Sequence, residues 1–312
     1  MYELIFLVLG IGGLWLGTEL IIKPAISIAR HFKLSEMFVG LTLLAIGTDL
    51  PELIINITAS VDRLNGIDTA GLVYGNIVGS AMSQLALTMG LAAMLGYLYL
   101  NKRQIRRDGL MLLSSVFILF VLSFNGMLSR LDGIILIIVY IIYFATLQRQ
   151  EKFVEKAVRA KKTDFRWSIV SLIGGFIILF LASNVTIDSA LILAERWGVA
   201  QSLIGVLLIG LGTSLPELAL VISALRNGSS QLGVGNLIGS NIFDVLFVLG
   251  ISAAIANIPV TQGLIFFDVP FLFVTSFVTL ILFWRDYKLD KKEATVLIGL
   301  YIIYVILKLV GY

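Results

Sequence analysis

Four carboxylic acids lie inside apolar stretches of this 312-residue sequence. They are Asp49, Glu52, Glu217 and Asp244. A charged side chain at the centre of a membrane-spanning helix costs about 2.5–3.5 kcal/mol on insertion scales, so it needs a partner or an aqueous cavity. The stretches that hold these acids contain no Lys or Arg, and Lys23 is the only intramembrane base that we expect elsewhere. Bound cations or protons are therefore the expected counter-charges.

Two motifs occur twice and contain or adjoin all four acids. Gly-Thr-Asp-Leu-Pro-Glu at 47–52 corresponds to Gly-Thr-Ser-Leu-Pro-Glu at 212–217, and Gly-Asn-Ile-Val-Gly-Ser at 75–80 corresponds to Gly-Asn-Leu-Ile-Gly-Ser at 235–240. Proline has no N–H and clashes with the carbonyl four residues earlier, so each first motif predicts a broken helix with a freed carbonyl. Such backbone survives at membrane depth only where it faces protein or a cavity. The glycines of the second motif, four residues apart, predict close helix packing.

Hydroxyl and amide oxygens accompany the carboxylates. Thr48 and Thr213 each precede a glutamate by four residues, so each hydroxyl can share the helix face of its carboxylate. The second motifs supply further oxygens at Ser80, Gln84 and Ser240. An all-oxygen site suits hard cations, and calcium accepts six to eight oxygens in flexible geometry; sodium also fits. The chain has no Cys and one His, which excludes thiolate chemistry and cysteine-based metal sites.

Composition indicates the setting for this chemistry. The chain is 58% hydrophobic and 14% charged, against roughly 25% charged residues in soluble domains. Apolar runs of about 20 residues, long enough to cross a bilayer as helix, fill almost the whole sequence. An enzyme is disfavoured, because no serine has a plausible base and no histidine lies in an apolar run. The ten predicted spans are 3–28, 37–60, 68–97, 109–126, 131–148, 168–194, 199–224, 231–257, 264–284 and 293–311.

The predicted fold is an all-α polytopic membrane protein of ten transmembrane helices, in two inverted five-helix repeats with broken helices at the centre. The repeats are 1–148 and 167–312, joined by a polar linker at 149–166. Basic residues gather in alternate loops and in this linker, which predicts that these loops are cytoplasmic, both termini are extracellular, and the protein lies in the cell membrane. Because each repeat has five helices, an odd number, the second repeat enters the membrane in the opposite orientation to the first. Inverted repeats with broken helices are typical of transporters whose site lies between the halves.

At these motifs the sequence resembles the calcium/cation antiporter superfamily, and within it the prokaryotic sodium/calcium exchangers, over nearly the whole chain. The resemblance implies alternating access to central sites where sodium and calcium compete, with the first and sixth helices sliding past the rest. It implies that Glu52 and Glu217 bind both ions. The other ligands that it implies are Thr48, Thr213, Asp244, Gln84, Ser80, Ser214, Ser240 and the carbonyls of Ala45 and Gly210. Asp49 departs from the family's serine, and Gln84 from its more usual asparagine.

Our leading hypothesis is sodium/calcium exchange that moves calcium out of the cell, because Ser80, Ser214 and Ser240 are hydroxyls that a sodium site would use. Proton/calcium exchange and potassium-dependent or broader divalent exchange stay open, since Asp49 could carry a proton, recruit a potassium ion or point away from the cavity. A cation channel is disfavoured, because channel pores usually lie on a symmetry axis along the membrane normal, whereas the repeats predicted here are inverted. We expect membrane lipid around a functional monomer, no cofactor besides the transported calcium and sodium ions, and no nucleic-acid partner.

Overall fold

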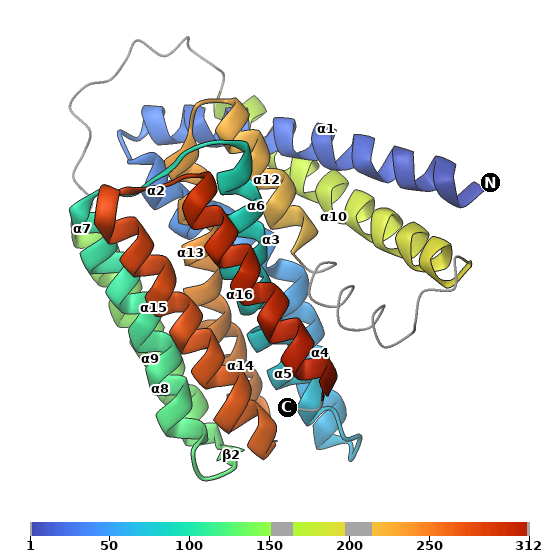
Figure 1. The fold of residues 1–312 in the computed structure, drawn as a ribbon, viewed down its shortest axis with the longest axis vertical. Helices are drawn as coiled ribbons and strands as arrows, with labels where there is room; N and C mark the ends of the chain where they lie inside the picture. Colours follow the sequence, from blue (N-terminus) through green and yellow to red (C-terminus); the bar gives the residue numbers. More distant parts are fainter. Residues whose placement is uncertain (1, 151–164, 197–213, 311–312) are drawn as a thin grey trace.

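The computed structural model describes residues 2–150, 165–196 and 214–310. These residues are almost entirely helical, with four strands of two residues each (Figure 1). In the described ranges, seven helices are long and apolar enough to cross a membrane, or eight if one bent helix pair counts as a single span. The prediction of a helical membrane protein is confirmed. The full set of ten spans is not tested, because much of the predicted span 199–224 lies outside the described residues.

The elements of the first half end at Gln150, and η denotes a π-helical segment. They are α1 (Tyr2–His31), α2 (Glu36–Val39), η1 (Gly40–Leu44), α3 (Ala45–Thr48), α4 (Leu50–Leu64), α5 (Ala70–Met82), η2 (Ser83–Thr88), α6 (Met89–Leu95), β1 (Leu98–Tyr99), α7 (Lys102–Gln104), η3 (Ile105–Gly109), α8 (Leu110–Ser123), β2 (Met127–Leu128) and α9 (Arg130–Gln150). One predicted boundary is wrong. The fourth helical run starts at Lys102 instead of 109, so Asp108 lies inside it.

The second half follows the same order of long helices, short strands and π-helical segments. Its described elements are α10 (Phe165–Arg196), α12 (Leu215–Arg226), α13 (Ser230–Phe243), η4 (Asp244–Val248), α14 (Leu249–Ile255), β3 (Ile258–Pro259), η5 (Leu264–Asp268), α15 (Val269–Asp286), β4 (Lys288–Leu289) and α16 (Lys291–Val310). The helix ends lie within a few residues of the predicted ones wherever the span is described.

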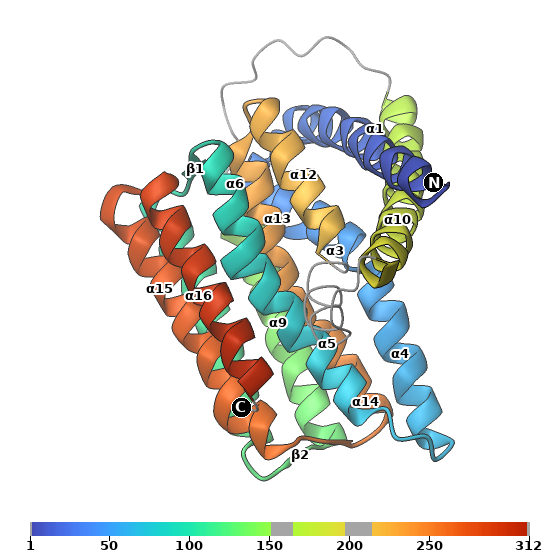
Figure 2. The ribbon, with the colours of Figure 1, turned by 45° about the vertical axis from the view of Figure 1, so that its right-hand side comes forward.

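Helices α1 and α10 lie side by side and cross the other helices obliquely (Figures 1 and 2). Glycines permit this close contact: a Cβ added at Gly17 would lie 2.9 Å from the backbone nitrogen of Leu179. Their buried residues form a hydrophobic cluster with parts of η1, α12 and α13, separate from the larger cluster of the main bundle. The first and sixth predicted helices therefore pack as one unit against the rest.

Two antiparallel strand pairs join the two halves at opposite ends of the bundle (Figure 2). β1 pairs with β4, with Leu98 opposite Leu289, and β2 pairs with β3, with Leu128 opposite Ile258. Each half thus contributes one strand to each pair.

Large apolar side chains cover the outer surface of the long helices. Trp15 on α1, Leu131 on α9 and Trp167 on α10 are each at least 60% exposed. Exposed apolar side chains are unfavourable in water, but they suit contact with lipid.

Candidate cation site

Both first motifs coincide with the start of a helix after a break. In the first half, α3 ends at Thr48, Asp49 adopts φ −87° and ψ 3°, and the helix resumes at Leu50 after a bend of 47°. In the second half, Ser214 has nearly the same conformation, φ −94° and ψ 4°, immediately before α12. Pro51 and Pro216 lie in the first turn of their helices, where the missing N–H is tolerated. The predicted break is therefore confirmed at Asp49.

The residues that follow the second motifs lie where two helices change to π-helical geometry. Gln84 is the second residue of η2, and Asp244 is the first residue of η4. These two residues lie 160 positions apart, the same offset as the motifs themselves. Single-turn π-segments widen a helix locally and are common at functional sites. The amide of Gln84 and the carboxylate of Asp244 are therefore corresponding groups of the two halves.

The four predicted acids are all buried and near one another. We call Asp49, Glu52, Glu217 and Asp244 the central acidic cluster. Glu52 is 3% exposed and the other three are not exposed at all. The charge of Asp49 interacts with those of Asp244, Glu217 and Glu52, and all of these interactions are repulsive. A cluster of this kind is costly to bury without positive charge beside it.

Several oxygens of the cluster have no hydrogen-bond partner within the described part of the chain. They include Asp49 Oδ2, both carboxylate oxygens of Glu217 and of Asp244, and the hydroxyls of Ser214 and Ser240. The large majority of buried side-chain polar atoms in proteins have a hydrogen-bond partner, and each exception asks for an explanation such as a bound ion. The concentration of such oxygens at one place makes it the candidate cation site of the described residues.

The Thr48 hydroxyl lies among three acceptors. It can donate to the Ala45 carbonyl at 3.2 Å, or to Asp49 Oδ1 or Asn236 Oδ1 at 3.4 Å. The Ala45 carbonyl also accepts from the Asp49 backbone N–H at 3.0 Å. Thr48 therefore contacts both Asp49 and the second half, at the point where the break at Asp49 interrupts the helix.

Gln84, Ser80 and Asn241 form a buried hydrogen-bond chain. Gln84 Nε2 donates to Ser80 Oγ at 3.2 Å, and Asn241 Nδ2 donates to Gln84 Oε1 at 2.7 Å. Asn241 Oδ1 has no partner among the described residues. The two second motifs are thus linked directly beside the acidic cluster.

The described residues contain no group of three acidic or histidine side chains close enough to hold a metal by themselves. A cation site here would therefore also need hydroxyl and carbonyl oxygens as ligands. Two predicted ligands, Thr213 and Gly210, lie outside the described residues.

Lys23 does not reach the cluster. Its ammonium forms an ion pair with Glu19 at 2.6 Å on α1, and its side chain is 68% exposed. The expectation that it was the only intramembrane base is also wrong, since Lys308 on α16 pairs with the buried Asp268 at 2.7 Å. Neither base lies beside the central acids.

Two buried acids were not predicted. Asp108 accepts from Arg107 at 2.7 and 2.9 Å and from the Tyr143 hydroxyl at 3.0 Å. Asp268, again 160 positions later, accepts from Tyr304 and Lys308, both at 2.7 Å. Both acids have cationic partners, unlike the central cluster. The signal that could have revealed them is the offset of 160, which they share with the second motifs.

Glycine packing is confirmed for the second half. A Cβ at Gly239 would lie 2.7 Å from both Cα and the carbonyl oxygen of Leu41, and a Cβ at Gly235 would lie 2.6 Å from the Met37 carbonyl. Helix α13 therefore touches the broken helix of the first half, backbone to backbone. At Gly75 and Gly79, no described atom lies within 4 Å of an added Cβ.

The sequence and the fold are similar to those of known membrane proteins. The sequence matches the family described as "Sodium/calcium exchanger protein" over residues 2–148 and 167–310. It is 29% identical to sodium/calcium exchanger MaX1 of Methanosarcina acetivorans, over 97% of each chain. It is 31% identical to inner membrane protein YrbG of Escherichia coli, over 83% of this chain and 81% of that one. The structure superimposes on the sodium-calcium exchanger NCX_Mj, soaked with sodium and calcium, with a TM-score of 0.82 and 28% identity over 98% of both chains.

Proposed function

The chain belongs to the sodium/calcium exchanger protein family, and from this membership we propose that it exchanges sodium for calcium across the cell membrane by alternating access, moving calcium outward. The observation that carries the proposal is a group of buried oxygens with no hydrogen-bond partner among the described residues, on Asp49, Glu217, Asp244, Ser214 and Ser240. Buried carboxylates without partners are costly in a rigid scaffold, and a bound cation would offset that cost.

Calcium and sodium would use overlapping oxygens. Glu52 and Glu217 carry the charge that a divalent ion needs, from corresponding places on α4 and α12. The unpaired hydroxyls of Ser214 and Ser240 suit sodium, which needs fewer charged ligands. Since the ions share the carboxylates, occupancy by one excludes the other. That competition is the physical basis of exchange.

The remaining ligands complete the proposal. Asp244 and Gln84 would flank the central position, and Thr48, Ser80 and the Ala45 carbonyl would contribute from the first half. The Ala45 carbonyl already accepts from the Thr48 hydroxyl and from the Asp49 backbone N–H. A sodium ion bound to this carbonyl would therefore displace the Thr48 hydroxyl. Thr213 and Gly210 would be their counterparts in the second half.

Alternating access would come from α1 and α10 moving as a unit past the rest. They pack against each other closely, and an ion pair between Arg196 and Glu3, with distances of 2.7 and 2.9 Å, links their ends. The proposed topology is ten helices in two inverted repeats, 1–148 and 167–312. The linker at 149–166 would be cytoplasmic and both termini extracellular. One chain would suffice for function, since the central acidic cluster comes from a single chain.

A second candidate is exchange coupled to protons or potassium. It is favoured by Asp49, which the second half replaces with Ser214. Asp49 is fully buried and within electrostatic reach of the other three acids, so it adds a fourth negative charge to the site. A proton or an additional monovalent cation would offset that charge.

The test is calcium uptake into liposomes that contain the purified protein, under separately imposed outward gradients of sodium, protons and potassium. Sodium-driven uptake that Glu52→Gln abolishes is the expected result. Asp62→Asn is the matched control, because Asp62 lies on the same helix, ten residues beyond Glu52. Uptake driven only by protons would exclude sodium coupling in favour of the second candidate. No calcium uptake under any gradient would exclude both.

A further inference from the structure

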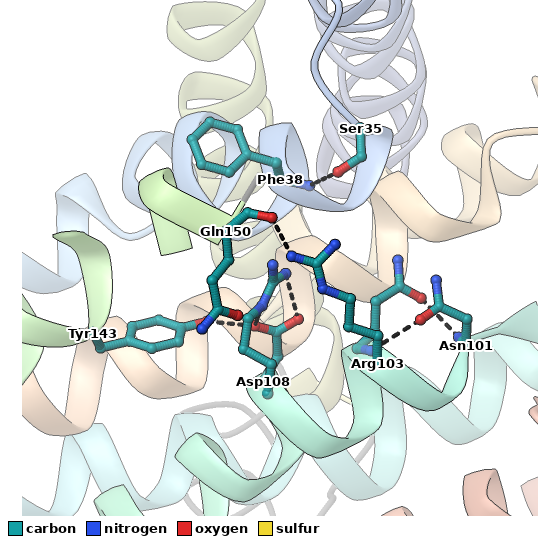
Figure 3. Close-up of polar contacts among 9 residues, drawn as sticks. Ser35, Phe38, Asn101, Arg103, Asp108, Tyr143 and Gln150 are labelled. Atoms are coloured by element: carbon teal, nitrogen blue, oxygen red, sulfur yellow. Dashed lines mark hydrogen bonds and ion pairs between the residues drawn. The ribbon is translucent and has the colours of Figure 1, made fainter. Parts of the chain in front are cut away.

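A shallow, open basic cavity of about 510 Å³ lies beside α7 and the end of α9. Its lining residues are Lys102, Arg103, Arg106, Arg107 and Gln150. Figure 3 shows Arg103 reaching toward the backbone of Gln150, with Asp108 and Tyr143 beside them. Four cationic side chains therefore surround one hollow.

Most of this positive charge is not neutralised by the acidic residues that the structure describes. Arg107 forms the ion pair with Asp108. Lys102, Arg103 and Arg106 form no ion pair with any acidic residue that the structure describes. A concave site with three uncompensated cations favours an anion that can accept several charge-assisted hydrogen bonds.

An apolar groove of about 470 Å³ continues from this cavity between α8 and α15. Arg106 lines both hollows, and the groove is otherwise apolar, with Leu110, Phe277, Ile281 and Trp284 along it. The Arg106 guanidinium lies 5.6 Å from the centre of the Trp284 ring, which holds the cation at the junction. The side chains of Leu110, Phe277 and Ile281 are each about half exposed. The groove therefore faces the surroundings of the protein along its length.

We propose that these two hollows together bind one anionic phospholipid, with its phosphate in the basic cavity and an acyl chain in the groove. The charge of the cavity and the apolar character of the groove match the two ends of such a molecule. Basic pockets between transmembrane helices on the cytoplasmic side commonly bind anionic headgroups. A soluble anion would satisfy only the cavity, and a lipid without net charge would satisfy only the groove. Because α8 and α15 come from different halves, the lipid bridges the two halves.

The test measures quenching of Trp284 fluorescence by lipids that are brominated on the acyl chain. Trp15, Trp167 and Trp197 are first changed to Phe, and the protein is placed in nanodiscs of phosphatidylcholine that contain equal amounts of either brominated phosphatidylglycerol or brominated phosphatidylcholine. We expect the anionic lipid to quench Trp284 more strongly. The triple variant Lys102→Gln/Arg103→Gln/Arg106→Gln should lose the preference, by roughly fivefold per cation in relative affinity.

The matched control is Lys33→Gln/Lys291→Gln/Lys292→Gln, which removes three positive charges from other loops that are predicted to be cytoplasmic. It should keep the preference, and Arg106→Lys should keep most of it. Equal quenching by the two lipids in the parent protein would overturn the proposal, and so would a preference that survives in the triple variant. Loss of the preference on adding inorganic phosphate would support the proposal, because it would show that the lipid phosphate and a free anion compete for the same cavity. Calcium transport does not enter this measurement, so its outcome is independent of the proposed exchange.

Discussion

Asn241 Nδ2 donates a hydrogen bond to Gln84 Oε1 at 2.7 Å, which joins the second motif of one half to that of the other. Gln84 also donates to Ser80, so both ends of its amide are engaged. Glutamine is one methylene longer than the family's more usual asparagine. This length lets the side chain reach across to α13, and Asn241 Oδ1 is left with no partner among the described residues.

The Gln84–Asn241 bond can be tested by shortening one partner. Gln84→Asn should break it, at a cost of about 0.5–1.5 kcal/mol. Because the freed groups border the sodium ligands, we expect the sodium concentration for half-maximal calcium exchange to shift by less than about tenfold, with little effect on maximal rate. Gln148→Asn, at an exposed position of α9, is the control. An unchanged sodium dependence would mean that Gln84 has only a packing role.

Calcium should stabilise the protein through the central acids. A ligand at 100 times its dissociation constant stabilises the folded state by about 2.7 kcal/mol, so thermal unfolding should shift upward with calcium and return on chelation. Glu217→Gln should raise the unfolding temperature without calcium, since it removes a charge from a repulsive cluster, and should abolish the calcium-dependent shift. Asp62→Asn should behave like the parent protein. A full calcium shift in Glu217→Gln would remove that residue from the site.

Asp49 should set the coupling ion. Asp49→Ser makes the first motif identical in type to the second, which has Ser214. We expect sodium-driven calcium uptake to persist and any added requirement for protons or potassium to disappear, because the fourth negative charge is gone. Uptake under the three gradients, compared with the parent protein, provides the measurement. Complete loss of sodium-driven uptake would mean that the Asp49 carboxylate itself holds a sodium or calcium ion.

The ion pair between Asp268 and Lys308 should be structural. Lys308→Met leaves the Asp268 carboxylate buried with only Tyr304 as a described partner, and breaking a buried pair in this way costs about 3–5 kcal/mol. Adding Asp268→Asn to Lys308→Met should recover much of that loss. Thermal unfolding of the two single variants and the double variant gives the coupling. Additive losses in the double variant would show that the two groups do not stabilise each other.

The contact of α13 with the broken helix should tolerate no side chain at Gly239. Gly239→Ala would place a methyl group 2.7 Å from Leu41 backbone atoms, and overpacking of this kind costs about 1–3 kcal/mol. We expect a lower unfolding temperature together with slower calcium exchange. Gly299→Ala on α16 is the control, because no described atom lies within 4 Å of its added Cβ. Equal unfolding temperatures for the two variants would argue against the close contact.

Much of the described fold could be predicted from hydropathy, since apolar runs of membrane length leave few alternatives. The helix break at Asp49 was also predictable, because Pro51 has a local and obligatory effect on the backbone. The burial of Asp108 was not. It stands in the run Arg-Arg-Asp-Gly, which is typical of a loop, and its partner Tyr143 lies 35 residues away. Lys308 and Asp268 are 40 residues apart, so that pairing was equally invisible to local patterns.

The exchanged strand pairs carry an evolutionary consequence. In a symmetric dimer, element i of one copy contacts element j of the other, and j of the first contacts i of the second. β1 with β4 and β3 with β2 follow that rule, because β1 and β3 hold the same place in their halves, as do β2 and β4. An ancestor that corresponded to one half would therefore have paired with a second copy of itself at both ends, before gene duplication and fusion joined the two copies into one chain.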